Sequence, residues 1–127
     1  MTYLWIAFGS AIGGVGRYWC SEVAVRLFGD AFPWGTILVN VVGSLIIGFV
    51  ATLMPPDGRL LSLPDAREFL MIGVLGGYTT FSAFSLQTLS LARESHYLPA
   101  IINVFLSVFL CLAAVWLGHA IAAAITR

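Results

Sequence analysis

Apolar residues gather in four long stretches of this 127-residue chain, and short polar segments separate them. The stretches cover about residues 3–25, 34–54, 69–91 and 98–125. A transmembrane helix needs roughly 20 mainly apolar residues, and each stretch is long enough. The pattern predicts an all-α membrane protein with four transmembrane helices. We expect a single transmembrane domain, residues 1–127, with both termini on the same side of the membrane.

The composition agrees with a membrane protein and argues against nucleic-acid binding. Hydrophobic residues make up 60% of the chain, charged residues only 9%, and lysine does not occur. A soluble domain carries about 25% charged residues. The formal net charge is zero, which removes the electrostatic basis for binding nucleic acid. We therefore expect a multi-pass protein that lies in the lipid bilayer and has no nucleic-acid partner.

The six arginines give almost no indication of how the chain is oriented. An excess of Lys and Arg in short loops normally sets orientation, and here the two sides nearly balance. The side of the termini has Arg59, Arg67 and Arg127, the other side has Arg26 and Arg93, and Arg17 lies within the first stretch. Two interpretations stay open. The chain inserts in both orientations, which allows an antiparallel dimer, or a small bias selects one orientation.

Polar side chains recur along one face of the second stretch. Thr36, Asn40 and Ser44 follow one another at four-residue spacing, so they share one side of a helix. Such groups often bind neighbouring helices in a membrane. For Asn40 we favour a functional role, because an amide at this depth is costly and its N–H groups can donate to an anion.

The fourth stretch repeats this spacing with Asn103, Ser107 and Cys111. The hydroxyl and amide donors again follow one face, and they do not cluster as a catalytic set would. Cys20 and Cys111 show neither a CxxC pair nor a metal-binding spacing, so we expect both to be small apolar fillers.

The first stretch carries small residues and an arginine. Gly9, Gly13 and Gly16 give the small-residue spacing of closely packed membrane helices. Arg17 follows directly, and an arginine inside a membrane span is a functional candidate by default. Two roles are open for it: it attracts anions to a vestibule, or it pairs with Glu22 or caps a neighbouring helix.

The third stretch contains a predicted helix break. Gly76 and Gly77 weaken the helix, and the β-branched Thr79 and Thr80 lose rotamer freedom in one. Broken helices at membrane depth are tolerated only against protein or water. In transporters, the backbone groups freed by such a break bind ions and substrates.

Aromatic and hydroxyl side chains follow the break. Phe81 and Phe84 share one face, Ser85 and Thr88 extend it, and Ser82 lies between the two rings. Phe pairs normally pack against lipid or core. Here the neighbouring hydroxyls favour a second interpretation, because the positive edge of an aromatic ring can contact a small anion.

Acidic residues are absent from the middle of every stretch, since Glu22, Glu68 and Glu94 lie near ends or loops. A cation path or a proton-coupled exporter would be expected to carry a buried carboxylate. This argues against the first alternative, a small multidrug exporter, whose first span needs a carboxylate where this chain has 11–16. The second alternative is a non-transporting assembly subunit. The spacing of Ser, His and acidic residues does not indicate an enzyme.

Two motifs carry a resemblance to a known family. Residues 35–40 read Gly-Thr-Ile-Leu-Val-Asn and residues 76–85 read Gly-Gly-Tyr-Thr-Thr-Phe-Ser-Ala-Phe-Ser. With the length and the four spans, they closely resemble the Fluc family of fluoride channels. The resemblance implies a dual-topology, antiparallel homodimer in the bacterial inner membrane. It also implies two pathways for passive, electrogenic fluoride export, which protects the cell against fluoride toxicity.

The resemblance also assigns residues. The pore asparagine matches Asn40, the pore phenylalanines match Phe81 and Phe84, and the vestibule arginine matches Arg17. The polar track matches Ser82, Ser85, Thr88 and Ser107, with Thr36 near an entrance.

The family's central, structural Na⁺ would bind the backbone carbonyls of Gly76 and Thr79 from both subunits. The chain departs from some members at two positions, with Asn103 in place of a pore tyrosine and Cys111 in place of a serine. These departures leave the track on the fourth helix open.

Overall fold

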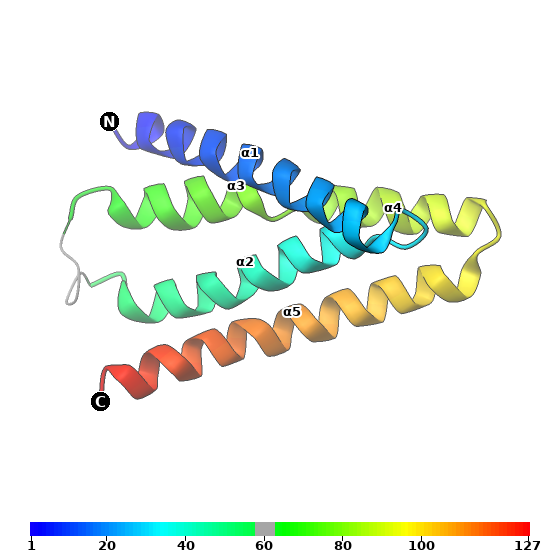
Figure 1. The fold of residues 1–127 in the computed structure, drawn as a ribbon. Helices are drawn as coiled ribbons and strands as arrows, with labels where there is room; N and C mark the ends of the chain where they lie inside the picture. Colours follow the sequence, from blue (N-terminus) through cyan, green and yellow to red (C-terminus); the bar gives the residue numbers. More distant parts are fainter. Residues whose placement is uncertain (58–62) are drawn as a thin grey trace.

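The computed structural model describes residues 1–57 and 63–127, which form helices and their connections (Figure 1). No strand occurs in these two ranges, so the predicted all-α class is confirmed. The elements in chain order are α1 Thr2–Phe28, α2 Trp34–Leu53, the π-helix η1 Glu68–Leu75, α3 Gly76–Tyr78, α4 Phe81–Arg93 and α5 Tyr97–Ile125.

The helix bounds agree with the four predicted stretches to within about three residues, and the third stretch is interrupted as expected. The interruption lies at Thr79 and Thr80, not at the glycine pair, because Gly76 and Gly77 stay helical in α3. Gly77 packs against α1, where a Cβ atom would lie 2.7 Å from the carbonyl oxygen of Ser10. This close packing explains why a residue with weak helix propensity remains in the helix.

Three helical segments are long and apolar enough to cross a membrane: Trp34–Leu53, Glu68–Arg93 and Tyr97–Ile125. The chain is thus a multi-pass membrane protein. α1 has 27 residues, which at about 1.5 Å per residue also reaches across a bilayer. Its glycines, serines and Arg17 lower its hydropathy, and its role as the fourth span stays a prediction.

Close backbone contact joins α2 to α5. A Cβ atom on Gly48 would lie 2.1 Å from the carbonyl oxygen of Val115, and one on Gly118 would lie 2.0 Å from that of Leu45. Real Cβ atoms do not come this close, so both glycines are required for the packing.

Small residues also bring α1 against the third segment. A Cβ atom on Gly13 would lie 2.1 Å from the carbonyl oxygen of Val74, and one on Gly9 would lie 2.6 Å from that of Phe69. Both contacted residues belong to η1. The small-residue pattern of the first stretch predicts close helix packing, and this prediction is confirmed.

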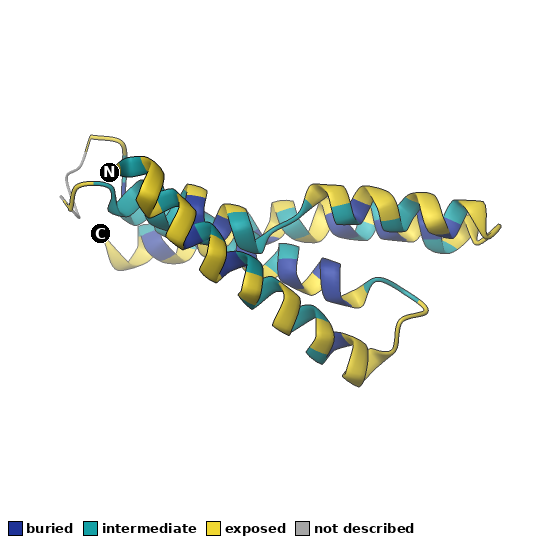
Figure 2. Ribbon diagram, turned by 90° about the horizontal axis from the view of Figure 1, so that it is seen from above, coloured by how far each residue is buried: buried dark blue, intermediate teal, exposed yellow. Residues whose placement is uncertain are grey.

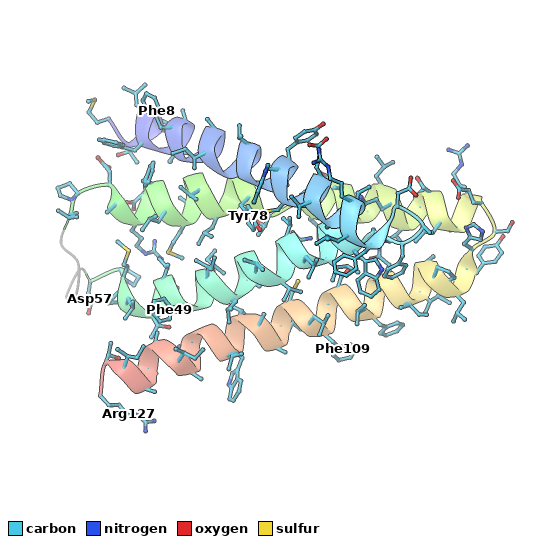
Figure 3. All side chains as sticks on the ribbon, in the orientation of Figure 1. Phe8, Phe49, Asp57, Tyr78, Phe109 and Arg127 are labelled. Carbon is cyan, nitrogen blue, oxygen red and sulfur yellow. The ribbon has the colours of Figure 1, made fainter. Side chains whose placement is uncertain are left out.

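The bundle is closed at one end and open at the other. Both termini lie at the same end, as expected from an even number of long helical segments (Figure 1). At the far end, α1 and the start of α2 diverge from α4 and α5 (Figure 2). Tyr78 projects at mid-length from the last turn before the break (Figure 3). On α4, the hydroxyl residues Ser82 and Ser90 are exposed.

The segment before η1 is tied to its surroundings at the end that carries the termini. The Thr2 hydroxyl donates to the Asp65 carboxylate, and Arg67 Nε donates to the carbonyl oxygen of Met54 at 3.2 Å. Arg59, which the sequence places on the side of the termini, lies outside the described residues.

Candidate functional site

The third helical segment breaks at two extended residues. Thr79 has φ −83° and ψ 158°, and Thr80 has φ −152° and ψ 120°. α3 ends before them at Tyr78, and α4 begins after them at Phe81. Two residues of extended backbone in the middle of a membrane segment need hydrogen-bond partners from other side chains.

Asn40 of α2 supplies these partners. Its Nδ2 donates to the carbonyl oxygen of Thr80 at 2.9 Å, and the Thr80 N–H donates to Asn40 Oδ1 at 2.8 Å. The side-chain amide thus bonds to both backbone groups of Thr80, as a neighbouring β-strand would. The amide uses its oxygen and one of its two N–H bonds in this way, so one N–H is left for another acceptor.

The break is also capped from within its own segment. The Thr80 hydroxyl accepts the N–H of Ala83 at 3.2 Å, as an N-cap residue does for the helix that follows. The Thr79 hydroxyl donates to the carbonyl oxygen of Leu75 at 2.9 Å. Both threonines therefore stabilise the ends of the helices on either side of them.

These bonds release two carbonyl groups from the helical pattern. In a continuous α-helix the N–H of Thr80 would donate to Gly76, and the N–H of Ala83 would donate to Thr79. Both N–H groups are taken instead by Asn40 and by the Thr80 hydroxyl. The carbonyls of Gly76 and Thr79 are the two that the family resemblance assigned to a cation.

Arg17 of α1 reaches one of these carbonyls. Its Nη1 donates to the carbonyl oxygen of Thr79 at 3.2 Å. Thr79 follows the last residue of α3, so the guanidinium lies at the negative end of this short helix. Of the two roles left open for Arg17, the structure shows the helix-capping one, and its role toward anions stays a prediction.

A groove of about 370 Å³ runs beside the break between α2, α4 and α5. Asn40, Phe81, Phe84 and Ser107 meet in its wall, together with Cys111. No charged residue belongs to the described lining of this groove. The remaining lining residues are Gly43, Ser44, Ile47, Thr79, Thr80, Val108 and Leu112.

A second, larger groove of about 1090 Å³ opens where the helix pairs diverge. Arg17, Thr36 and Ser82 lie in its wall, and Thr80 belongs to both grooves. Asp30 and Glu94 also line it. This groove is therefore polar and charged, whereas the smaller groove on the other side of Thr80 carries no charge.

The two phenylalanines form a ring pair at the start of α4. Their centroids are 5.3 Å apart and their planes meet at 51°. Phe84 is 8% exposed, whereas Phe81 is 77% exposed. The Phe84 ring is therefore fixed by the protein, and the Phe81 ring stands out from this single chain.

A chain of hydrogen bonds links α4 to α5. Ser107 donates to Asn103 Oδ1 at 3.3 Å, Asn103 Nδ2 donates to the Thr88 hydroxyl at 2.9 Å, and Thr88 donates to the carbonyl oxygen of Phe84 at 2.8 Å. Asn103 is only 1% exposed. The hydroxyl protons of Thr88 and Ser107 therefore point to acceptors within the protein in this structure.

Comparison with known proteins places the chain in a family. The family model described as CrcB-like protein, camphor resistance (CrcB), matches residues 4–119. The chain belongs to the CrcB-like family. Curated relatives agree: a fluoride-specific ion channel FluC of Rhodospirillum rubrum is 56% identical over 119 residues, which cover 94% of this chain and 92% of the relative.

Further relatives carry the same name. The FluC protein of Methylocella silvestris is 51% identical over 127 residues, covering 100% of this chain and 97% of the relative. That of Opitutus terrae is 57% identical over 117 residues, covering 92% and 89%. The resemblance seen in the two motifs is confirmed, and the multidrug-exporter alternative has no support in these comparisons.

The structure of this CrcB-like protein brings together part of the predicted site. Asn40, Phe81, Phe84 and Ser107 line the smaller groove, and Thr36, Ser82 and Arg17 line the larger one. Within the described residues, neither groove includes the three remaining members of the predicted track in its lining. These are Ser85, Thr88 and Asn103.

Two residues of the site were not predicted from the sequence. The sequence places Thr80 in the break, and the structure shows that its backbone also bonds to Asn40 and that its hydroxyl caps α4. Its position before a helix is an N-cap signal that could have been used. Gln87 lines the larger groove, and among the described residues its Oε1 is the buried side-chain oxygen or nitrogen atom with no hydrogen-bond partner.

Side-chain clusters give no metal site in the described part of the chain. No group of three His, Cys, Asp or Glu residues there lies close enough to hold an ion. Any cation at this site would need backbone oxygens, and the carbonyls of Gly76 and Thr79 are the ones that the break releases.

Proposed function

We propose that this protein is a fluoride-selective channel that lets fluoride leave the cell passively, with net movement of charge. One observation carries the proposal: a broken membrane helix, held by Asn40, borders an uncharged groove that also contains the Phe81 and Phe84 rings. The names of the relatives support it, because each is a fluoride-specific ion channel matched over nearly the whole chain.

The groove has the chemistry that a small anion needs. A bare ion in a low-dielectric site costs tens of kcal/mol unless it is compensated. Asn40 keeps one N–H available, Ser44 adds a hydroxyl, and the ring edges add weak positive charge. A carboxylate would repel the anion, and the described lining of the smaller groove contains none.

In this proposal the predicted residues have distinct roles. Asn40, Phe81, Phe84 and Ser107 form the narrow part of the pathway, and Thr36 and Ser82 lie on the side of the larger groove. Arg17 lies in the wall of that groove together with Asp30 and Glu94, and its guanidinium is the group there that would attract an anion. Ser85, Thr88 and Asn103 continue the polar track along α4 and α5.

A second copy of the chain, in antiparallel orientation, completes the pathway. Phe81, Ser82 and Ser85 are exposed in this single chain, and hydroxyls at membrane depth are satisfied better by protein than by lipid. The nearly balanced arginines support insertion in both orientations.

A structural Na⁺ fits the released carbonyls. Neutral carbonyl oxygens suit a hard cation, and two copies would supply Gly76 and Thr79 twice. Bound there, the ion would offset the partial negative charge that four carbonyls bring together. Within the chain itself, Asn40 and Thr80 keep these oxygens out of helical hydrogen bonds, and Arg17 shares the Thr79 oxygen.

Ion efflux from liposomes tests the channel. Purified protein is reconstituted, and fluoride and chloride electrodes record release with a potassium ionophore present for charge balance. We expect rapid fluoride release that needs the ionophore, with little chloride release. Protein that is dimeric by light scattering but releases no fluoride would instead be a non-transporting assembly subunit, and its polar faces would serve only in helix packing.

A further inference from the structure

The Thr79 carbonyl oxygen has two possible positively charged partners, the Arg17 guanidinium and the proposed cation. Arg17 Nη1 donates to it at 3.2 Å within one chain, and the cation proposed above would bind the same oxygen. A carbonyl oxygen has two lone pairs, so geometry alone allows both partners. Electrostatics does not favour both, because two unit charges on one oxygen repel each other strongly away from bulk water.

The position of Arg17 makes this conflict hard to avoid. The residue is half-buried in the middle of α1, and the α1 backbone is packed directly against η1 through Gly9 and Gly13. The base of the arginine side chain is therefore fixed beside the break. The larger groove, whose wall Arg17 already forms, offers space into which its guanidinium can turn away from Thr79.

We propose that Arg17 and the structural cation compete for the Thr79 carbonyl. This inference rests on the cation site of the proposed function. In the separate chain, the guanidinium caps the broken helix and satisfies the carbonyl. When two copies meet and a cation binds, Arg17 turns toward the larger groove, where it can attract anions. One side chain then serves both roles that the sequence left open, at two stages of assembly.

Competition makes a signed prediction about Arg17→Gln. Removing the positive charge removes the repulsion, so the variant should bind sodium more tightly, by about tenfold or more. The same variant loses a helix cap, so in the absence of sodium it should be less stable than wild type. A purely structural role would lower stability equally at every sodium concentration and would leave the sodium affinity unchanged.

The measurement is the thermal unfolding midpoint of the detergent-solubilised protein as sodium replaces N-methyl-D-glucamine at constant ionic strength. A ligand that binds only the folded state stabilises it by RT ln(1 + [L]/Kd), so the way the midpoint rises with sodium concentration gives an apparent Kd. Arg26→Gln is the matched control, because it removes the same charge from an exposed position in the last turn of α1. Arg26→Gln should leave the sodium Kd at the wild-type value, and Arg17→Lys, which keeps the charge, should stay near it.

Three results would overturn the inference. The first is an Arg17→Gln variant whose sodium Kd is unchanged or weaker. The second, needed if that variant does not fold, comes from the wild type: the Arg17 guanidinium ¹⁵N signal should shift as sodium is added, and a signal that does not move contradicts competition. The third is a wild type that sodium does not stabilise, which removes the cation site as well. Fluoride efflux, measured separately, decides whether the channel function stands.

Discussion

Asn40 and Thr80 are joined by two antiparallel hydrogen bonds, with Nδ2 to the Thr80 carbonyl at 2.9 Å and the Thr80 N–H to Oδ1 at 2.8 Å. One side chain from α2 therefore takes the place of a peptide group of a neighbouring strand. The extended backbone at the break exists because this partner is present. A change at position 40 should affect the shape of α4's start as well as the groove.

Asn40→Asp tests this relationship with almost no change in size. The carboxylate can accept the Thr80 N–H but cannot donate to the Thr80 carbonyl, and its negative charge faces the groove. We expect folding stability to fall by about 1–3 kcal/mol and fluoride efflux to fall by at least tenfold. Unfolding and efflux are measured on the same preparation. Ser44→Ala is the control, since it removes a groove hydroxyl and leaves both bonds intact; equal losses in the two variants would contradict a special role for Asn40.

Replacing each phenylalanine by leucine separates packing from ion passage. Phe84 is 8% exposed and should lose about 1 kcal/mol of stability when its ring is removed, whereas Phe81 is 77% exposed and should lose little. Both variants should impair fluoride efflux while the dimer stays folded, because both lose an aromatic edge at the groove. Unchanged efflux in the two variants would reject contact between the ring edges and the anion.

Substitution of Asn103 tests whether this residue holds α4 and α5 together or contacts the ion directly. It is 1% exposed and links Ser107 to Thr88. Asn103→Leu leaves the Ser107 hydroxyl without its acceptor, so we expect a loss of about 1–3 kcal/mol in stability. Thr88→Val should then add little further destabilisation in the double variant, because both act through one chain of bonds.

The efflux of Asn103→Leu decides between the two roles. A brace predicts that residual folded protein still conducts fluoride at a rate within about fivefold of wild type. Loss of efflux without loss of stability would show that Asn103 contacts the ion directly.

Cys111 offers a chemical probe of the smaller groove. Its thiol is half-buried and belongs to the groove wall beside Phe81 and Phe84. A small methanethiosulfonate reagent should attach there and slow fluoride efflux by at least about fivefold through steric obstruction. Cys111→Ser should conduct and resist the reagent, while Cys20 remains in both proteins as an internal control. A reagent effect that survives in Cys111→Ser would locate the reactive thiol at Cys20.

The sequence predicted the long helices well because lipid imposes a simple length rule on apolar segments. It predicted that the third helix breaks but placed the weakness at Gly76 and Gly77. The glycines remain helical because Gly77 is packed against Ser10, and the chain opens where Asn40 provides hydrogen bonds. The position of this break depends on hydrogen bonds from a side chain of another helix, so local helix propensity alone cannot locate it.

Arg17 and Asn103 show the same limit in the site. The sequence placed Asn103 on a polar face and Arg17 inside the first stretch, but it could not determine which atoms their side chains reach. The structure gives Arg17 a carbonyl acceptor across the helix packing, and it turns Asn103 between α4 and α5. Spacing did indicate the helix faces of Asn40, Phe81 and Phe84, and these three residues line one groove.

The shared location of the two termini has a consequence for the assembled protein. In the proposed antiparallel pair, a two-fold axis in the membrane plane exchanges the terminal end of one copy with the terminal end of the other. Both faces of the assembly are then chemically identical. Such an object has no built-in direction, so its current–voltage relation should be symmetric in equal solutions. Only the fluoride gradient and the membrane voltage would decide which way the ion moves.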